Sequence, residues 1–284
     1  MADVREGHGM VEQRDAAQAG QTVIEFADVS KTFVTGKGER VQALEGLNLA
    51  VRQGELVAIV GQTGCGKSTA FNLLLGLFEA TSGTVRVQGL DPHAQFDDLK
   101  GRIAVVFQDG RLLPWRTAQD NVALGLEYLG MSKSERHRIA REWLARLGLE
   151  GREKAHPHEL SGGMRQRVGI ARCFALDPEI ILCDESFSAL DEVTADRLRG
   201  EFTKLVKEEG KTGVFITHSI EEAVMMGDRV AVFRAPGHVA GEFDLPGTFD
   251  DAELARYRKM VRDAMTHPSG PPPGAPRDPQ EDTR

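Results

Sequence analysis

One short stretch of the chain has residue types and a spacing that suit phosphate chemistry. It reads GQTGCGKST, from Gly61 to Thr69, and fits the pattern G-x-x-x-x-G-K-[ST]. Glycines in such a loop allow backbone N–H groups to turn inward around phosphate oxygens. Lys67 can reach the β- and γ-phosphates, and the Ser68 hydroxyl can ligate Mg²⁺. The stretch therefore predicts a site for a nucleoside triphosphate together with Mg²⁺.

The residues around this stretch supply the setting that such a loop needs. ELVAIV (55–60) is a short apolar run typical of a buried strand, and TAFNLLLGLF (69–78) is suited to a helix. A helix that begins here points its N-terminus at the bound phosphates. A chance glycine-rich turn is the alternative, and the strand–loop–helix order disfavours it.

Two adjacent carboxylates end a later apolar run. IILCD (180–184) predicts a buried strand that closes with Asp184, and Glu185 follows directly. A carboxylate at such a strand end can hold Mg²⁺ through water, and a second carboxylate beside it can polarise an attacking water. Glu185 could instead only cap the strand end. Asp184 before it and SALD (188–191) after it favour the chemical role.

A second anion-binding stretch, ELSGGMRQRVGIAR (159–172), lies well downstream of the first. A serine and two glycines precede a basic, helix-forming run, which is typical of a helix N-terminus that receives an anion. Such a terminus contributes roughly 0.3–1 kcal/mol toward an anion, which is too little to hold a nucleotide alone. The second stretch is therefore expected to assist at a site that other residues have already built.

The chain resembles the ATP-binding-cassette ATPases over residues 22–235, on motifs that occur in the family's order. LSGGMRQR (160–167) matches the signature motif, SALD (188–191) matches the D-loop, and His218 after GVFIT matches the switch histidine. In this family two cassettes pack head to tail, and each ATP lies between the phosphate loop of one and the signature of the other. The resemblance thus implies that the second stretch serves a partner's nucleotide.

The resemblance also implies roles for individual positions. The residues that it assigns to ATP and its Mg²⁺ are Phe33, Gly61, Gln62, Thr63, Gly64, Cys65, Gly66, Lys67, Ser68, Thr69, Ser161, Gly162, Gly163 and Asp191. Those that it assigns to the Mg²⁺ itself are Ser68, Gln108 and Asp184, with Asp184 acting through water. Those that it assigns to catalysis are Glu185 as general base, His218 at the γ-phosphate, Lys67 and Gln108. Two positions depart from the usual pattern, since Ser186 replaces a common proline and Phe33 a commoner tyrosine.

Strands that alternate with helices must position these residues, which predicts a parallel sheet covered on both faces. The strands are expected over 22–33, 41–55 (a strand pair with turn residues), 55–61, 82–89, 101–108, 178–185, 211–219 and 228–237, the last as a closing strand. Helices are expected over 132–149, 192–209 and 250–267. The resulting fold class is α/β, a P-loop NTPase (RecA-like) core with an antiparallel β subdomain and an inserted helical subdomain at about 110–172.

Local patterns refine two of these helices. Ser132 with Glu135, and Asp250 with Glu253, have the spacing of capping boxes. The expected buried face of the first helix comprises Ile139, Trp143, Leu144 and Leu147, and that of the second comprises Leu254, Tyr257 and Val261. The second helix is expected to pack on the body of the molecule.

The chain divides by composition into four segments. Residues 1–20 are polar and expected to be disordered, and residues 21–237 form the ATPase domain. Residues 238–267 form an extension with one helix, and the proline-rich residues 268–284 are expected to be disordered. Neither a secretory signal nor an apolar run of spanning length is visible, so a second chain is expected to hold the protein at any membrane where it works.

Bulk composition excludes some functions. The net charge of −8 argues against nucleic-acid binding. Three cysteines without a zinc or disulfide spacing indicate reduced thiols in a cytosolic protein. Four uses of a cassette remain: an importer's energy subunit, an exporter's ATPase subunit, a translation factor and a DNA-repair ATPase. A single signature and the lack of sustained heptads disfavour the last two.

FQDGRLLPWRTAQDNVALGL (107–126) favours import, because it resembles the matching stretch in importers of nitrate, alkanesulfonates and taurine. The resemblance implies that Leu112, Leu113, Pro114 and Trp115 line a groove for a helix of a transmembrane permease. Trp115 could instead belong to the core of the helical lobe. The expected partners are permease subunits, a second ATPase subunit (most simply an identical copy) and, indirectly, an external solute-binding protein. The expected location is the cytoplasmic face of the membrane, as a peripheral subunit.

Overall fold

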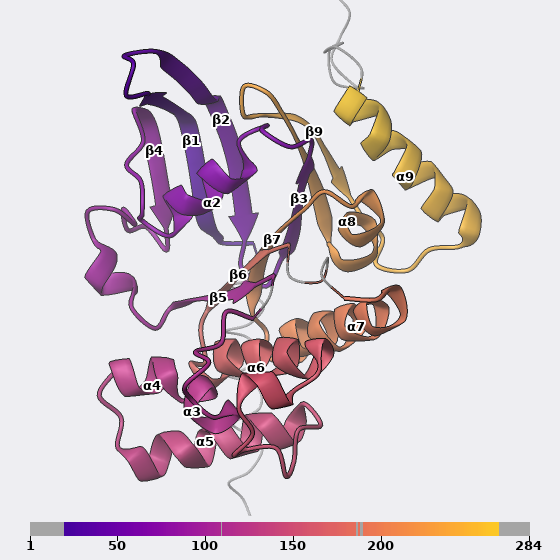
Figure 1. Cartoon of the computed structure of the whole chain (residues 1–284). Coiled ribbons are helices and arrows are strands. Elements are labelled where there is room, and N and C mark those ends of the chain that lie inside the picture. The colour runs from indigo at the N-terminus through magenta and orange to yellow at the C-terminus, as the bar shows by residue number, and fades with distance from the viewer. Residues whose placement is uncertain (1–19, 109, 186, 188–189, 267–284) are drawn as a thin grey trace, which may run out of the picture.

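A computed structural model of the chain describes residues 20–108, 110–185, 187 and 190–266 (Figure 1). The disorder expected for residues 1–20 and 268–284 falls outside this range, apart from Gly20, and so do Ser186, Ser188 and Ala189. No helix among the described residues is both long enough and apolar enough to cross a bilayer.

A six-stranded sheet forms the centre of the molecule. Its order is β5 (Ile103–Phe107), β6 (Ile180–Asp184), β7 (Thr212–Thr217), β3 (Leu56–Gly61), β8 (Arg229–Arg234) and β9 (His238–Asp244). The first five strands run parallel, and β9 runs antiparallel to β8. β3 and β7 are buried along their whole length, as expected of central strands covered on both faces. The predicted parallel sheet is confirmed.

A three-stranded antiparallel sheet covers one face of the central sheet. Its order is β2 (Arg40–Arg52), β1 (Thr22–Val34) and β4 (Ser82–Val87), and helix α2 (Lys67–Leu74) lies beside it. Alternate side chains of β3, including Val57 and Ile59, point into this core together with Phe71 of α2. The phosphate loop, which connects β3 to α2, is thereby held between two sheets.

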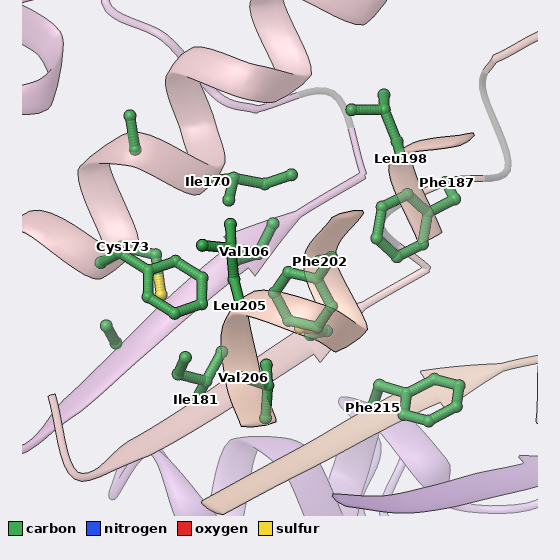
Figure 2. Packing of buried hydrophobic residues seen from close by; sticks show 14 of the residues in the cluster. Val106, Ile170, Cys173, Ile181, Phe187, Leu198, Phe202, Leu205, Val206 and Phe215 are labelled. Atoms are coloured by element: carbon green, nitrogen blue, oxygen red, sulfur yellow. The ribbon is translucent and has the colours of Figure 1, made fainter. Parts of the chain in front are cut away.

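Helices cover the opposite face. They are α6 (Gly162–Ala175), α7 (Glu192–Glu208), α8 (Ile220–Met226) and α9 (Asp251–Thr266). Ala58 and Val60 of β3 point to this side. Figure 2 shows Ile170 of α6 and Phe202 of α7 packed among side chains of the strands, Val106 included. The two faces of one strand thus support two separate cores.

A helical layer packs on the outer side of α6. It contains α3 (Ala118–Val122), α4 (Leu124–Tyr128) and α5 (Lys133–Arg146), and short 3-10 helices lie at Phe96–Leu99 (η1) and Pro157–Glu159 (η2). The predicted buried face of α5 is confirmed, since Leu144 and Leu147 are buried in the helical core and Ile139 and Trp143 pack against that core. The capping box is only half formed. Ser132 accepts a bond from the Glu135 amide at 3.4 Å, but the Glu135 carboxylate pairs with Arg138 at 2.5 Å.

Helix α9 has the predicted cap and the predicted contacts. The Asp250 amide donates to the Glu253 carboxylate at 3.1 Å, and the Glu253 amide donates to Asp250 at 2.8 Å. Val261 is fully buried, and Leu254 and Tyr257 pack against the helical core. The capping box and the packing of α9 on the body are therefore confirmed.

Two expectations about strands are wrong. Residues 41–55 do not form a strand pair, because β2 is one continuous strand with a bulge where Val29 pairs with Leu47 and Lys31 with Leu44. Gly46 has a φ of +57° there and absorbs the extra residue, so a glycine that resembled a turn signal marks a bulge. Residues 228–237 do not close the sheet, since β9 adds a further strand at that edge.

Candidate nucleotide site

The phosphate loop lies close against its surroundings. Gly66 caps the N-terminus of α2 with a φ of +97°, and a Cβ there would lie 2.5 Å from the carbonyl oxygen of Ala43. Only glycine accepts both the backbone conformation and this approach. The local sequence therefore fixes where β3 ends and α2 begins.

Lys67 carries its charge inside the loop. Its ammonium group donates to the carbonyl oxygens of Gly61 at 2.7 Å and Gln62 at 3.0 Å, and only 7% of the residue is exposed. A nearly buried ammonium beside a helix N-terminus favours an anion at this position. Ser68 lies in the first turn of α2 and is exposed, and Thr69 follows it. The loop residues thus fit a polyphosphate.

Three further segments meet the loop at one edge of the sheet. Asp184 is the last residue of β6, Gln108 and His218 directly follow β5 and β7, and the loop follows β3. Phe107 pairs with Asp184 across β5 and β6, which keeps the two strand ends level. Ligands of open parallel sheets bind outside the carboxyl ends of the strands. The phosphate loop and these three motif residues therefore lie at the same edge of the sheet.

Glu185 and His218 are direct neighbours. The Nδ1 atom of His218 lies 3.2 Å from Oε1 of Glu185. Glu185 has a φ of +45°, an unfavourable region for a non-glycine residue, and its amide donates to the Ile216 carbonyl at 3.0 Å. Phe187 anchors the same segment, since its ring packs edge-on against Phe202 at 5.8 Å (Figure 2). The carboxylate is therefore held beside the imidazole.

The surroundings of Asp184 suit a cation. Partial burial, and then the negative charge of Glu185, raise the pKa of Asp184, whereas the charges of Arg111 and Lys67 act in the opposite direction. A divalent cation near the two carboxylates would relieve this repulsion. Ser68, Gln108 and Asp184 offer the oxygen donors that Mg²⁺ prefers. These residues therefore fit the ion that the sequence implied.

Side chains of α6, the helix of the signature motif, form hydrogen bonds with the backbone at and after the end of β5. Gln166, which is buried, donates to the carbonyl oxygen of Phe107 at 3.0 Å. Arg172 donates to the carbonyl oxygens of Gly110 and, at 2.9 Å, Arg111. Sequence reasoning missed both residues. The only signal was a glutamine on the otherwise apolar face of a helix.

Ser161 begins α6 as its N-cap and accepts a bond from the Met164 amide at 3.3 Å. Gly162 and Gly163 form the first turn, and a Cβ on Gly163 would lie 3.0 Å from Cγ2 of Thr194. Thr194 belongs to the first turn of α7, which Asp191 caps. The signature thus contacts the first turn of α7, which directly follows the D-loop motif.

The two anion-binding stretches lie on opposite faces of the central sheet. Helix α2 packs into the core shared with the three-stranded sheet, whereas α6 packs into the helical core (Figure 1). Phosphates held by the loop at the start of α2 therefore do not face the start of α6 in the same chain.

Phe33 lies at the far end of β1, opposite Val41 of β2. It is half-buried, its ring packs edge-on against Phe78 at 5.3 Å, and the Lys31 Nζ atom lies 5.1 Å from the ring centre. A ring with a partly open face suits stacking on a planar base. This geometry is compatible with the position assigned to adenine.

Trp115 does not belong to the core, so that alternative is wrong. Trp115 is 72% exposed. It lies on a turn that the buried side chain of Asn121 holds in place. The Asn121 amide accepts from the Leu113 N–H at 2.7 Å and donates to the carbonyl oxygens of Leu113 and Arg116, each at 3.1 Å. A fixed turn therefore presents an exposed tryptophan.

Comparison with known proteins agrees with these observations. Residues 44–188 match the family model described as ABC transporter. An uncharacterized ABC transporter ATP-binding protein of Methanocaldococcus jannaschii is 43% identical over 229 residues, which cover 79% of this chain and 84% of that protein. The taurine import ATP-binding protein TauB of Escherichia coli K12 is 44% identical over 198 residues, which cover 69% of this chain and 76% of TauB.

Solved structures give the same result. The ATP-binding cassette MJ0796, in a dimeric post-hydrolysis state bound to ADP and Pi, is 37% identical with a TM-score of 0.69, and the match covers 79% of this chain and 100% of that one. The cbiO1 protein of Clostridium perfringens, part of the ABC transporter complex cbiONQ, is 25% identical with a TM-score of 0.73, covering 84% and 95% of the two chains. This chain therefore belongs to the ABC transporter family, as an ATP-binding and ATP-hydrolysing cassette with the α/β fold of P-loop NTPases.

Proposed function

We propose that this cassette powers an importer of a small solute, and that two copies share each ATP. The main support is the placement of the phosphate loop and the signature on opposite faces of the sheet. The phosphate loop of one copy then meets the signature of the other. ATP joins the two copies, and its hydrolysis releases them. Such a switch requires only that ATP and its hydrolysis products differ in their affinity for the joined and the separated copies.

The proposed chemistry uses the residues at the sheet edge. Glu185 accepts a proton from the water that attacks the γ-phosphorus, and His218 orients this carboxylate and contacts the γ-phosphate. Lys67 holds the β- and γ-phosphates. Ser68, Gln108 and, through water, Asp184 would hold a Mg²⁺ ion, which would supply positive charge toward these phosphates. The products are ADP and inorganic phosphate.

The partner's residues complete this site. Ser161, Gly162 and Gly163 of the second copy contact the γ-phosphate through the hydroxyl and the helix N-terminus. Asp191 lies where α7 begins, and we assign it to communication between the copies. The remaining loop residues, Gln62, Thr63, Gly64 and Cys65, contribute backbone amides toward the phosphates, and Phe33 stacks on the adenine.

We assign permease docking to an aromatic patch formed by Phe96, Trp115 and Tyr128, which are all exposed. Arg116, next to Trp115, pairs with Glu127, next to Tyr128, at 2.6 Å. The Nζ atom of Lys100 lies 5.5 Å from the centre of the Tyr128 ring, and Lys100 directly follows η1, the short helix that Phe96 begins. Exposed aromatic side chains on fixed backbone are typical of interface hot spots.

Movement can pass from this patch to the nucleotide through one segment. Residues 107–116 run from β5, past Gln108, to Trp115, and α6 grips their backbone through Gln166 and Arg172. A permease helix that moves Trp115 therefore pulls on the glutamine and on the signature helix together. This path supports coupling between docking and closure.

Import of a taurine-like solute is the substrate class that we favour. The support is similarity to TauB proteins of Escherichia coli and of Pelagibacter ubique, the latter 38% identical over 220 residues. Permease subunits and an external binding protein would select the solute. The cassette itself would act at the cytoplasmic face of the membrane, held there by the permease.

The test uses a Glu185→Gln chain, tagged in its native host and purified from gently solubilised membranes with Mg·ATP. We expect normal ATP binding, hydrolysis lowered by about 10²–10⁴-fold, and a stable complex of two cassettes with a permease and an external binding protein. A permease without a binding protein would favour export. A variant that hydrolyses ATP at the normal rate would refute the role of Glu185, and a complex without membrane protein would refute the transport proposal.

A further inference from the structure

A buried ion pair joins α7 to α8 behind the nucleotide site. Nη1 of Arg199 lies 2.8 Å from Oε1 of Glu222, and the two side chains are only 9% and 8% exposed. Removing two charges from water is costly, so such a pair adds little stability over apolar residues of similar size. The contacts that Arg199 and Glu222 make with neighbouring residues indicate a role other than stabilising the fold.

Glu222 acts on the residues around His218. The second carboxylate oxygen of Glu222 accepts a hydrogen bond from the buried Thr217 hydroxyl, and the Thr217 hydroxyl accepts one from the Ser219 amide at 2.9 Å. Thr217 and Ser219 flank His218, whose ring faces Glu185. The Glu222 carboxylate therefore fixes the backbone on both sides of the histidine.

Arg199 acts on the start of α7. Its guanidinium also donates to Glu192 at 2.8 Å and to Asp196, both in the first two turns of this helix. Burial opposes the charge, but the bonds to Asp196, Glu192 and Glu222 outweigh it and hold the pKa of Arg199 above its ordinary value. The cation thus ties α8 to the helix end that Asp191 caps.

That helix end is the part of α7 that meets the signature. Thr194 lies in its first turn, against Gly163. In the dimer of the proposed function, a partner's nucleotide approaches Gly163, and any displacement there reaches the first turn of α7. An unbroken series of contacts then leads through Arg199, Glu222 and Thr217 to the histidine.

We infer that Arg199 and Glu222 are positioning residues that set the orientation of His218 according to whether the partner's nucleotide occupies the signature of the same chain. The inference rests on the proposed function for the role of His218 and for the shared sites. Because separating a buried ion pair is costly, α7 and α8 move together, and Thr217 carries the movement to the histidine. Each ATP site therefore reports its occupancy to the other.

The experiment compares three variants of the full chain. Glu222→Gln keeps the shape of the side chain and removes the charge, and Thr217→Val removes only the hydroxyl that joins Glu222 to the histidine segment. Glu221→Gln is the matched control, because Glu221 is the adjacent residue, is exposed and pairs with Arg258 of α9. ATP affinity, the ATPase rate against ATP concentration, and thermal unfolding are measured for each.

We expect Glu222→Gln and Thr217→Val to bind ATP within about twofold of the unchanged chain but to lower kcat about tenfold or more, which identifies lost transition-state positioning. The Hill coefficient for ATP should fall toward one, because the sites no longer communicate. Glu221→Gln should match the unchanged chain. If Glu222 and Thr217 only stabilised the fold, their variants would have a lower unfolding temperature, and kcat would not fall while the affinity for ATP stayed normal.

Two results would overturn the inference. One is a kcat and a Hill coefficient in Thr217→Val that equal those of Glu221→Gln. The other is a loss of kcat in both variants that disappears at a temperature where they are fully folded. His218→Ala separates this failure from failure of the proposed function: normal hydrolysis by that variant refutes the proposed role of the histidine, whereas impaired hydrolysis beside a normal Thr217→Val refutes the inference alone.

Discussion

Replacement of Trp115 by alanine should separate ATP hydrolysis from transport. The residue is 72% exposed in the isolated chain, so its truncation should change the free energy of unfolding by less than about 0.5 kcal/mol. The affinity for ATP and the basal ATPase rate should stay near normal. Docking of the permease should weaken, because Trp115 contributes the most exposed aromatic side chain of the proposed patch.

The magnitude follows from the exposed area. A buried aromatic side chain covers about 200 Å², so the exposed 72% leaves about 140 Å² for a partner to cover. At about 25 cal/mol per Å² this is an upper limit of about 3.5 kcal/mol, and interface hot spots begin at about 2 kcal/mol. Docking should therefore weaken between about 30-fold and 400-fold.

The chain's second tryptophan supplies the control. Trp143 packs against Phe174 with ring centres 5.3 Å apart and lies 4.7 Å from the Arg146 guanidinium. Trp143→Ala should cost up to about 3 kcal/mol of stability and lower basal and coupled ATPase rates together. The assay compares solute uptake in cells with the basal ATPase rate of each purified chain. Normal uptake by Trp115→Ala, or equal loss of both of its activities, would refute the docking role.

Two further predictions concern stability. Gly66→Ala should destabilise the nucleotide-free chain by about 1–3 kcal/mol, because it combines left-handed strain with a 2.5 Å approach to the Ala43 oxygen. Gly64→Ala has the same left-handed strain but no atom within 4 Å of the new Cβ, so it should lose only about 1 kcal/mol of stability. Urea unfolding measures both variants, and equal losses of stability in Gly66→Ala and Gly64→Ala would contradict the packing argument. Burial raises the pKa of Cys173 to about 12, whereas an unfolded cysteine ionises near about 8.5. The folded state therefore keeps a proton that the unfolded state loses, so the free energy of unfolding falls as pH rises between these values. The free energy of unfolding of Cys173→Ala should fall less steeply than that of the unchanged chain over pH 8–10. Parallel curves for the two chains would refute this cause.

Much of the central sheet could be predicted because its signals are contiguous in the sequence. β3, β6 and β7 are apolar runs, and the glycine pattern from Gly61 to Gly66 fixes the turn between β3 and α2. Asp184 was likewise expected at the end of one apolar strand, and the family resemblance placed His218 after another. Apolar runs and glycine spacing are sufficient for the strands and the turn, whereas the pairing of β6 with β7 emerged only from the structure.

Features that depend on distant partners could not be predicted. Gly46 has the same type as a turn glycine, and only the pairing of β2 with β1 makes it a bulge. β9 lacks an apolar run, and its place depends on the free edge of β8. Glu135 has the spacing of a capping residue, but Arg138 competes for its carboxylate.

Buried polar residues were the largest omission from the candidate site. Arg199 and Glu222 belong to polar helical sequences that resemble solvated faces, whereas Gln166 stands on the otherwise apolar face of α6. Each is buried because a particular backbone carbonyl or opposite charge from another element meets it. Sequence patterns record the residue type but not this partner, so the links between the motifs emerged only from the structure.

The shared ATP site can be tested by mixing two inactive chains. Lys67→Ala removes the phosphate-binding cation. Gly162→Asp places a carboxylate at the signature, where a Cβ has ordinary van der Waals room 3.4 Å from Leu190. Each variant alone should hydrolyse almost no ATP, whereas a mixed dimer holds one complete site, with the phosphate loop from one chain and the signature from the other.

The ATPase rate of the equimolar mixture is the most direct measurement. Random pairing makes half of the dimers mixed, each with one of two sites complete, so the rate should reach up to about one quarter of that of the unchanged chain. It should also fall when the mixture is diluted below the range where dimers form. A mixture as inactive as its components at every concentration would contradict a site built from two copies.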